Sequence, residues 1–305
     1  MAMKRIRVGG AIDSSAMSLG LWRVGNMTKA EVTALVAAAY ENGIDFFDTA
    51  DIYAMGKSEE LLGAAIRELG IRDSVTVQTK AGIRPGMFDF SKEYLTGAVE
   101  ASIKRLGLDC IDVLLLHRND ALGELEEVAE VFEDLRTRGL VRRFGVSNHT
   151  AGQIALLSRS LADRLVANQL QFSVVNAGMI DQGIYVNTTI PQSTMRDGGL
   201  LDYCRLENIT VQAWSPLQYG FFEGSFLGNE KFAPLNAELD RLSAETGFTP
   251  AALAVAWIMR HPANIQPIVG TTSVSHLKEL CAAGDYVMSR SDWYSLYIAA
   301  GHKLP

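Results

Sequence analysis

Cysteine is scarce in this 305-residue chain, which has only Cys110, Cys204 and Cys281, scattered along the sequence and odd in number. That pattern excludes a small scaffold held together by disulfides, and the spacings match no zinc or other metal motif. We therefore expect the three cysteines to be reduced residues that fill the core, and we expect no metal site.

Long hydrophobic runs and blocks of positive charge are also missing. No stretch reaches about 18 consecutive apolar residues, so no membrane-spanning helix is predicted. The first five residues, Met1-Ala-Met-Lys-Arg5, lack the apolar segment of a secretory signal. With 28 Lys and Arg against 35 Asp and Glu, the formal charge is −7, which argues against nucleic acid or an acidic membrane as a partner. We expect a cytoplasmic protein, either a monomer or a small homo-oligomer.

What the sequence does contain is a repeating pattern of apolar runs and helical segments. Hydrophobic residues make up 48% of the chain, enough for a large core. Short apolar runs alternate with helical stripes at intervals of about 30 residues, as in βα units. The runs are continuous rather than alternating, as expected for a parallel sheet covered on both faces. Eight expected strands end at Trp22, Phe47, Lys80, Leu116, Asn148, Gln171, Ala213 and Val269.

The pattern predicts a single domain, residues 1–305, folded as a (β/α)8 barrel, the TIM barrel. A Gly-rich turn after residues 5–8 predicts an N-terminal β-hairpin, and residues 289–300 predict a C-terminal helix. The alternative is a doubly wound sheet. That fold usually carries a Gly-x-Gly-x-x-Gly turn after its first strand to bind a dinucleotide, and the sequence has none.

The most informative stretch is residues 48–63. An apolar strand ends at Asp48, and a second carboxylate, Asp51, and a phenol, Tyr53, follow within six residues. A helix comes next, and we predict that Ser58 caps it. Ionisable groups at the carboxyl end of a strand indicate chemistry in α/β proteins, because functional sites are built at that edge.

Lys80 and His117 stand at two further predicted strand ends, so a barrel would bring them to the same face as Asp48 and Tyr53. A free tyrosine has a pKa near ~10 and is a poor proton donor, and a neighbouring ammonium lowers that pKa. Asp48 would keep Lys80 charged, and His117 would donate a hydrogen bond to a substrate oxygen. Each residue alone also has a structural interpretation, as a turn cap, a half-buried aromatic, an exposed lysine or a core histidine.

The stretch Asp-Thr-Ala-Asp-Ile-Tyr-Ala-Met-Gly-Lys-Ser-Glu-Glu-Leu-Leu-Gly resembles the signature of the aldo-keto reductases. Asp48, Tyr53, Lys80 and His117 match the catalytic tetrad of that family in the same order along the chain. The resemblance covers nearly the whole sequence and is strongest to a bacterial subgroup with no settled substrate. It implies a (β/α)8 barrel that binds NADPH, with NADH possible, without a Rossmann domain.

The resemblance also implies the cofactor contacts. The family holds the nicotinamide amide with residues that match Ser147, Asn148 and Gln169, and it stacks an aromatic ring, usually Tyr, where this chain has Trp214. Its commonly basic residues are here replaced by Thr272, Ser273 and His276, which predicts only a modest preference for NADPH over NADH. The implied cofactor-binding residues are Ser147, Asn148, Gln169, Trp214, Ser215, Pro216, Leu217, Gly270, Thr271, Thr272, Ser273 and His276.

For the substrate pocket we predict Trp22, Ile52, Arg118, His149, Phe221 and Phe222. The aromatic residues suit a hydrophobic carbonyl compound, whereas Arg118 could pair with an acidic group. The two phenylalanines could instead pack within their own loop.

The predicted reaction is the reversible reduction of aldehydes or ketones to alcohols. Hydride would pass from nicotinamide C4 to the carbonyl carbon, and Tyr53 would protonate the oxygen. One alternative is a non-catalytic nicotinamide-binding regulatory subunit, which loss of a tetrad residue would favour; none is lost. Another is a metal-dependent hydrolase or isomerase built on Asp48, Asp51 and His117, but such sites usually need more ligands.

Overall fold

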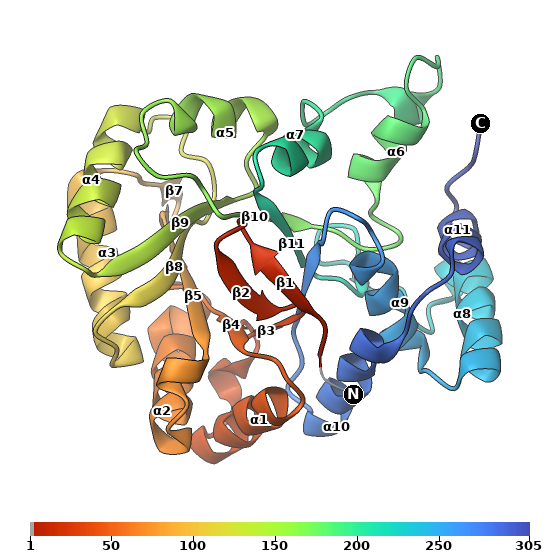
Figure 1. The fold of residues 1–305 in the computed structure, drawn as a ribbon, viewed down its shortest axis with the longest axis horizontal. Coiled ribbons are helices and arrows are strands. Elements are labelled where there is room, and N and C mark those ends of the chain that lie inside the picture. Colours follow the sequence, from red (N-terminus) through yellow and green to blue (C-terminus); the bar gives the residue numbers. More distant parts are fainter. Residues whose placement is uncertain (1–2) are drawn as a thin grey trace.

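The computed structural model describes residues 3–305, and in these residues eight parallel strands close into a barrel (Figure 1). The predicted (β/α)8 fold is therefore confirmed. The order around the barrel is β10-β11-β14-β3-β4-β5-β8-β9, with β9 and β10 paired to complete the circle. The barrel strands are β3 (Ser18–Gly20), β4 (Phe46–Asp48), β5 (Thr76–Ala81), β8 (Ile111–Leu116), β9 (Val141–Ser147), β10 (Ala167–Gln171), β11 (Thr210–Trp214) and β14 (Gln266–Val269).

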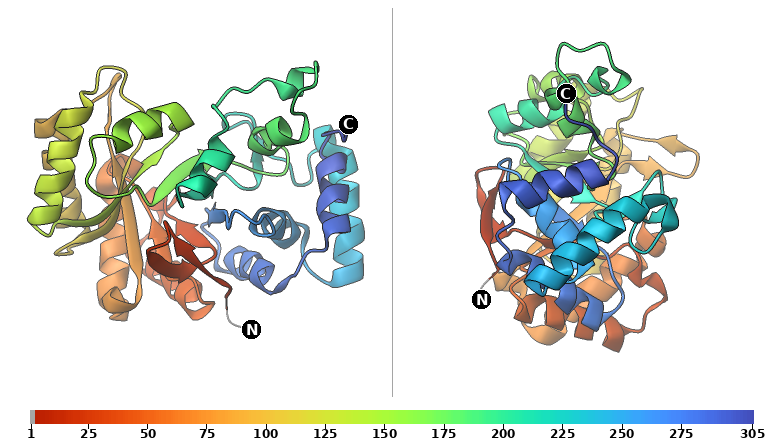
Figure 2. Two further views of the ribbon diagram at one scale, coloured as in Figure 1. Left: turned by 45° about the horizontal axis from the view of Figure 1, so that its top comes forward. Right: turned by 90° about the vertical axis from the view of Figure 1, so that its right-hand side faces the viewer.

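Helices follow the strands and form the outer layer, as Figures 1 and 2 show. Three units carry a second helix: α6 and α7 both follow β10, α8 and α9 both follow β11, and α11 follows α10 after β14 and packs beside α8. The helices are α1 (Lys29–Glu41), α2 (Lys57–Leu69), α3 (Lys92–Leu106), α4 (Leu125–Thr137), α5 (Ala151–Ser158), α6 (Gly178–Ile184), α7 (Leu200–Leu206), α8 (Ala233–Thr246), α9 (Pro250–Met259), α10 (Val274–Cys281) and α11 (Arg290–Ala299).

Helix starts follow from local capping chemistry at most positions. Thr28 and Glu31 form a capping box at α1, each side chain accepting a hydrogen bond from the other's backbone N–H. The prediction that Ser58 caps α2 is wrong. The helix begins at Lys57, after Gly56 in a left-handed conformation, so Ser58 already lies in the first turn with its hydroxyl buried and without a hydrogen-bond partner among residues 3–305.

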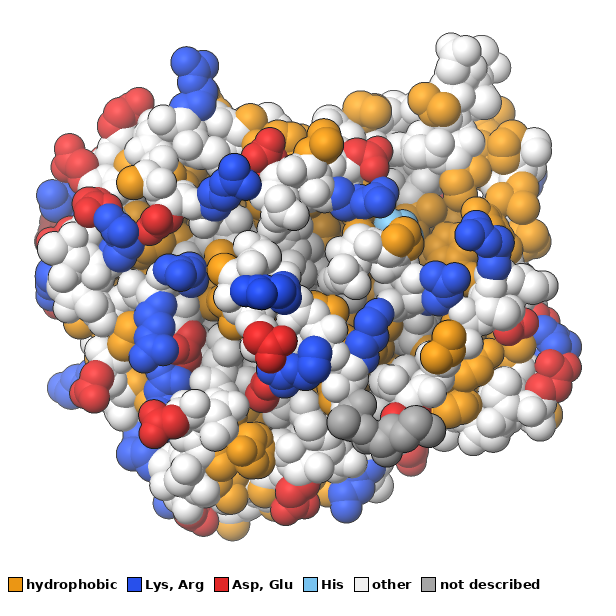
Figure 3. Space-filling model, viewed as in Figure 1, with side chains coloured by type: hydrophobic (Ala, Val, Ile, Leu, Met, Phe, Trp, Pro, Cys, Tyr) orange, Lys and Arg blue, Asp and Glu red, His pale blue; other side chains and the backbone are white. Residues whose placement is uncertain are grey.

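The amino end of the barrel is covered by the predicted hairpin, formed by β1 (Arg5–Val8) and β2 (Ile12–Ser15). In Figure 1 this hairpin crosses the middle of the barrel, and Figure 3 shows basic and acidic side chains mixed over the same face. Side chains at the starts of the barrel strands hold it: Thr210 accepts from the Gly9 N–H at 3.0 Å, and Asp45 accepts from the Ser15 N–H at 2.8 Å. The hairpin therefore closes this end.

Two tryptophans join α9 to α11. The rings of Trp257 and Trp293 stack with centroids 4.8 Å apart, and each indole N–H donates to the other residue's backbone carbonyl, at 3.0 and 3.1 Å. This reciprocal arrangement satisfies both buried donors. In residues 3–305 no helix has the length and apolarity needed to cross a membrane, and the three cysteines are free.

Candidate active site

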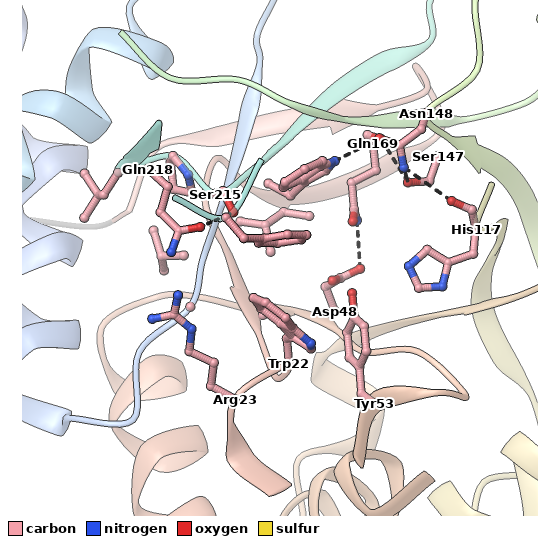
Figure 4. Close-up of a pocket in the computed structure, with 18 of the residues that line it drawn as sticks. Trp22, Arg23, Asp48, Tyr53, His117, Ser147, Asn148, Gln169, Ser215 and Gln218 are labelled. Atoms are coloured by element: carbon pink, nitrogen blue, oxygen red, sulfur yellow. Dashed lines mark hydrogen bonds between the residues drawn. The ribbon is translucent and has the colours of Figure 1, made fainter. Parts of the chain in front are cut away.

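The opposite, carboxyl end of the barrel contains a pocket of about 430 Å³, a size typical of small-molecule sites. Figure 4 shows that the side chains around it come from many different strands and the loops after them. Its lining residues are Gly20, Trp22, Arg23, Asp48, Ile52, Tyr53, Ile83, His117, Arg118, Ser147, Asn148, Gln169, Trp214, Ser215, Pro216, Leu217, Gln218, Phe222, Ser225, Ile268, Val269, Gly270, His276 and Leu280.

The four predicted catalytic residues meet at this end. Lys80 is completely buried, and its Nζ lies 2.8 Å from Asp48 Oδ2, 2.7 Å from the Thr49 carbonyl oxygen and 3.2 Å from Tyr53 Oη. The rings of Tyr53 and His117 lie edge to face with centroids 5.8 Å apart. In Figure 4 both point into the same space. The phenol and the imidazole therefore face one position in the pocket, and the buried lysine ammonium contacts the phenol.

The expected fall in the pKa of Tyr53 is not observed. Burial raises the pKa of this phenol and Asp48 adds to the increase, so the opposing effect of Lys80 only limits it. Burial also disfavours the ammonium form of Lys80, but Asp48 and Tyr53 outweigh that cost, and the pKa of Lys80 lies above its usual value. The result is a protonated phenol beside a permanently charged lysine.

His117 is electrostatically different from the other three residues. Burial, Lys80 and Arg118 all hold the pKa of His117 well below its ordinary value, so the ring is neutral at physiological pH. Its Nδ1 is buried and has no hydrogen-bond partner among residues 3–305. A neutral imidazole still has one N–H to donate, which fits a group that binds an oxygen rather than one that supplies a proton.

Asp48 is held by more than its lysine. Gln78 and Gln169 donate to its Oδ1 at 2.6 and 2.9 Å, and both also donate to the amide oxygen of Gln212. Gln212 in turn donates to Gln266 at 2.9 Å, and Gln266 reaches the hairpin by donating to the Ser15 carbonyl at 2.8 Å. A chain of buried amides thus runs through the barrel from the hairpin to Asp48.

A second carboxylate group lies close to Tyr53 along the chain. Burial, together with the charge of Glu59, raises the pKa of Asp51 to about 7. Glu59 is itself fully buried, bonded to Arg105 at 2.6 Å and to the Thr79 hydroxyl at 2.5 Å. Glu59 therefore anchors α2 to its neighbours, a role that its position at the start of a helix did not suggest.

Most of the predicted cofactor-binding residues line the pocket, but Thr271, Thr272 and Ser273 do not. Ser273 is occupied as the cap of α10, accepting from the His276 N–H, and the Thr271 hydroxyl accepts from the Ser273 N–H at 3.1 Å. Thr272 is exposed outside the pocket. Of the residues predicted in this loop, only Gly270 and His276 border the pocket.

Ser147, Asn148 and Trp214 form a connected group on one wall. Asn148 donates to the Ser147 hydroxyl at 2.7 Å and accepts from the Trp214 indole at 3.1 Å, as dashed lines mark in Figure 4. Asn148 has a left-handed backbone, with φ of 58°. Amide, hydroxyl and indole groups therefore border the same part of the pocket.

Of the predicted substrate residues, Trp22, Ile52, Arg118 and Phe222 line the pocket, whereas His149 and Phe221 do not. Phe222 lies between two tryptophans, with its ring 5.0 Å from Trp22 and 5.6 Å from Trp214. His149 is turned into the protein, with its Nδ1 2.9 Å from the Ser147 carbonyl oxygen. Phe221 is 67% exposed and packs against the ring of Phe222.

Sequence reasoning missed several lining residues, of which Arg23 and Gln218 are the most polar. In Figure 4 Arg23 points toward Ser215 and Gln218, at the end of the pocket away from His117. The Ser215 hydroxyl donates to Gln218 Oε1 at 2.8 Å, from a backbone with φ of 52°. The position of Arg23 directly after Trp22 was the only available signal. No group of three or more His, Cys, Asp or Glu side chains in residues 3–305 is arranged to hold a metal ion.

Comparison with known proteins gives the same family from sequence and from structure. Residues 16–298 match the model of the aldo/keto reductase family. A 6-dehydroglucose reductase of Novosphingobium aromaticivorans is 34% identical over 96% of this chain and 94% of its own length, and one of Agrobacterium fabrum is 31% identical over 98% of both. An aldo-keto reductase from Klebsiella pneumoniae, crystallised with NADPH, superposes with a TM-score of 0.79 at 29% identity, covering 97% of this chain and 94% of that one. The chain therefore belongs to the aldo/keto reductase family.

Proposed function

We propose that this oxidoreductase reduces aldehydes or ketones to alcohols with NADPH, and that Tyr53 donates the proton. The observation that carries the proposal is the contact of 3.2 Å between Tyr53 Oη and Lys80 Nζ, with Lys80 fixed by Asp48 at 2.8 Å. A buried phenol that stays protonated, next to a cation that stabilises its phenolate, is suited to give up a proton as negative charge develops on a carbonyl oxygen.

The remaining groups have complementary roles in this proposal. Neutral His117 donates its N–H to the same carbonyl oxygen, which orients the carbonyl and stabilises the charge that develops on it. Asp48 keeps Lys80 protonated, and the amides of Gln78 and Gln169 orient Asp48. After transfer, Lys80 stabilises the phenolate until Tyr53 regains a proton.

The donor set of the pocket fits a nicotinamide dinucleotide. The amide and hydroxyl groups of Asn148, Ser147 and Gln169 suit a carboxamide, and Trp214 offers a flat aromatic face. Arg23 supplies positive charge for a diphosphate near Ser215. When bound, the reduced nicotinamide supplies the hydride that converts the carbonyl carbon to that of an alcohol.

The NADPH complex of the Klebsiella relative supports this choice of cofactor. His276 lines the pocket at a position where the family commonly has an arginine. Because histidine is a weaker cation than arginine, we infer only a modest preference for NADPH over NADH. The complete tetrad gives no support to a non-catalytic subunit. Because strands from residue 18 to residue 269 close one barrel, we also infer that the chain is a single domain.

The test of the proposal is Tyr53→Phe, assayed by NADPH oxidation across a panel of aldehydes and ketones. Loss of the general acid should lower kcat by about 10²–10⁴, while NADPH binding, measured by fluorescence titration, stays within a factor of about three. Near-normal turnover by the variant would mean that the proton comes from another group.

A further inference from the structure

Arg118 is the one pocket residue whose charge the proposed reaction does not use. It directly follows His117, is half-buried, and lines the pocket beside Tyr53. Its charge acts on both catalytic neighbours: it opposes the rise in the pKa of Tyr53 that burial causes, and it adds to the effect of burial that holds the pKa of His117 low. Its guanidinium therefore lies at the reacting end of the pocket, whereas Arg23 lies at the other end.

No acidic partner accompanies this guanidinium. Within residues 3–305, Arg118 makes no ion pair or side-chain hydrogen bond, and its closest defined contact is the ring of Phe221, 5.9 Å from its Cζ. Other half-buried arginines are paired; Arg105, for example, bonds to Glu59 at 2.6 Å. A partly desolvated charge without a counterion is costly, and a ligand that brings one recovers that cost.

The pocket itself offers no compensating negative charge. Among the described residues, Asp48 is the only carboxylate that lines it. Its Oδ2 is bonded to Lys80, and its Oδ1 accepts from Gln78 and Gln169. Because Asp48 is paired with Lys80, the positive charge of Arg118 is left without compensation near the reacting carbonyl. The walls beyond, which include Trp22, Ile52 and Phe222, are apolar.

We propose that the preferred substrates are carbonyl compounds that carry a carboxylate, and that Arg118 binds this carboxylate while Tyr53 and His117 hold the carbonyl oxygen. The proposal rests on the proposed function and adds a substrate class to it. Arginine suits the role because its planar fork matches a carboxylate in a bidentate geometry. Phe221 positions the fork by packing under it. A neutral hydroxyl would leave the guanidinium without a counterion.

The experiment compares two acids with their methyl esters as substrates: phenylglyoxylate, with its carboxylate next to the ketone, and 4-formylbenzoate, with its carboxylate across a ring. The enzyme is the full chain with NADPH, and the readout is the ratio of kcat/KM for acid over ester. We expect at least one pair to favour the acid about ten-fold or more. In Arg118→Gln that ratio should fall about ten- to a hundred-fold, mainly through KM, and Arg118→Lys should restore part of it.

Arg143→Gln is the matched control, because it removes one exposed positive charge from β9 and lies outside the pocket. It should leave the ratio unchanged. A wild-type enzyme that reduces the esters as well as both acids, or an Arg118→Gln variant that slows acid and ester equally, would overturn the inference while leaving the proposed reaction intact.

A binding measurement separates the inference from the reaction. Isothermal titration of the enzyme with NADP⁺, which carries no hydride, compares 4-formylbenzoate with its ester without reduction taking place. Tighter binding of the acid that disappears in Arg118→Gln supports the anion site even if no carbonyl is reduced, an outcome that would contradict only the proposed function. Equal binding of acid and ester to wild type and variant would contradict the inference.

Discussion

The two ends of the barrel differ in which residues adopt a left-handed backbone conformation. Residues with left-handed φ at the amino end are those that tolerate it, such as Asn208 before β11, Asn264 before β14 and Gly43 before β4. At the carboxyl end the same conformation is imposed on Met55, at φ of 56°, and on Ser215, at φ of 52°. The carboxyl end also has suited residues in this conformation, such as Asn148, but only there do we find unsuited ones among residues 3–305.

Unpaired polar groups follow the same division. At the amino end the hairpin is tied by partnered groups, as in the bond from Gly9 N–H to Thr210. At the carboxyl end, Asp51 Oδ1 and His117 Nδ1 are buried without partners among residues 3–305. Strain and unsatisfied groups persist only where the surrounding structure enforces them, and they are typical of functional sites. The comparison teaches that stability is concentrated at one end and chemistry at the other.

The largest expected effect comes from Lys80, a residue of the carboxyl end that should contribute to stability as well as to catalysis. Lys80→Met should lower kcat at least about a hundred-fold and also cost about 3 kcal/mol in the free energy of unfolding, because Asp48 would be left as a buried unpaired charge. Urea unfolding and NADPH oxidation measure the two quantities. The double variant with Asp48→Asn removes both charges and should regain most of the stability while remaining inactive. If Lys80→Met alone is as stable as wild type, the protein does not need the Lys80 charge to keep Asp48 buried.

Gly9→Ala should separate the two ends most clearly. Gly9 has φ of 58°, and an added Cβ would lie 2.5 Å from Val166 Cα. We expect a loss of about 3 kcal/mol in stability from overpacking and strain, with kcat per folded molecule unchanged. Gly10→Ala is the matched control, since its φ is 67° but its nearest atom would be 4.0 Å away, and it should cost only about 1 kcal/mol. An equal loss in both variants would mean that the contact with Val166 is not what excludes a side chain.

Asp51→Asn should stabilise the carboxyl end in a pH-dependent way. The pKa of Asp51 is raised to about 7, so the folded state resists its ionisation and wild-type stability falls as pH rises from ~4 through 7. The variant removes this cost and should be about 2 kcal/mol more stable than wild type at pH 8, with little difference at pH 4. Thermal or urea unfolding at several pH values gives the comparison.

Asp89→Asn should change the stability in the opposite direction from Asp51→Asn. Burial disfavours the charge of Asp89, but hydrogen bonds from Ser91 and Arg84 prevail and lower its pKa. That variant should be less stable than wild type at pH 8, and the difference should shrink as the pH falls through the pKa of the folded state. The same trend in both variants would show that the local environments do not control the two carboxyls.

The smallest effects are expected when methionine and asparagine are exchanged between left-handed positions at the two ends. Met55 is 96% exposed and left-handed, so Met55→Asn should stabilise the protein by about 0.5 kcal/mol through relief of backbone strain. Asn208→Met, at φ of 57°, should destabilise it by about 1 kcal/mol. Precise denaturation curves are needed at this size. Two changes of the same sign would contradict the proposed difference between the ends.

The sequence predicted the parts of this molecule that depend on local patterns. The eight strands, the hairpin and α11 were all predicted correctly, because apolar runs and helical stripes extend over only a few positions. Ser58 was misjudged because the turn before α2 ends in left-handed residues, which shifts the start of the helix. Strand ends were enough to bring the tetrad together, since a closed barrel fixes where they meet.

The rest of the pocket depends on where loops run and which way side chains turn. His149 lies two residues beyond β9, but its imidazole turns back to the Ser147 carbonyl. Phe221 and Phe222 are neighbours, yet only Phe222 enters the pocket, where its left-handed φ of 64° helps aim it. The pKa of Tyr53 was expected to fall because only its charged neighbour was visible, whereas burial is a property of the folded chain.

The chain's four tryptophans give the molecule two independent optical reporters. Trp257 and Trp293, stacked at 4.8 Å and 8°, form a coupled pair of chromophores whose near-ultraviolet circular dichroism signal depends on the packing of α9 against α11. Trp22 and Trp214 border the pocket on either side of Phe222, so their emission responds to whatever occupies it. Folding and occupancy can thus be followed in one unlabelled sample, each from its own pair of indoles.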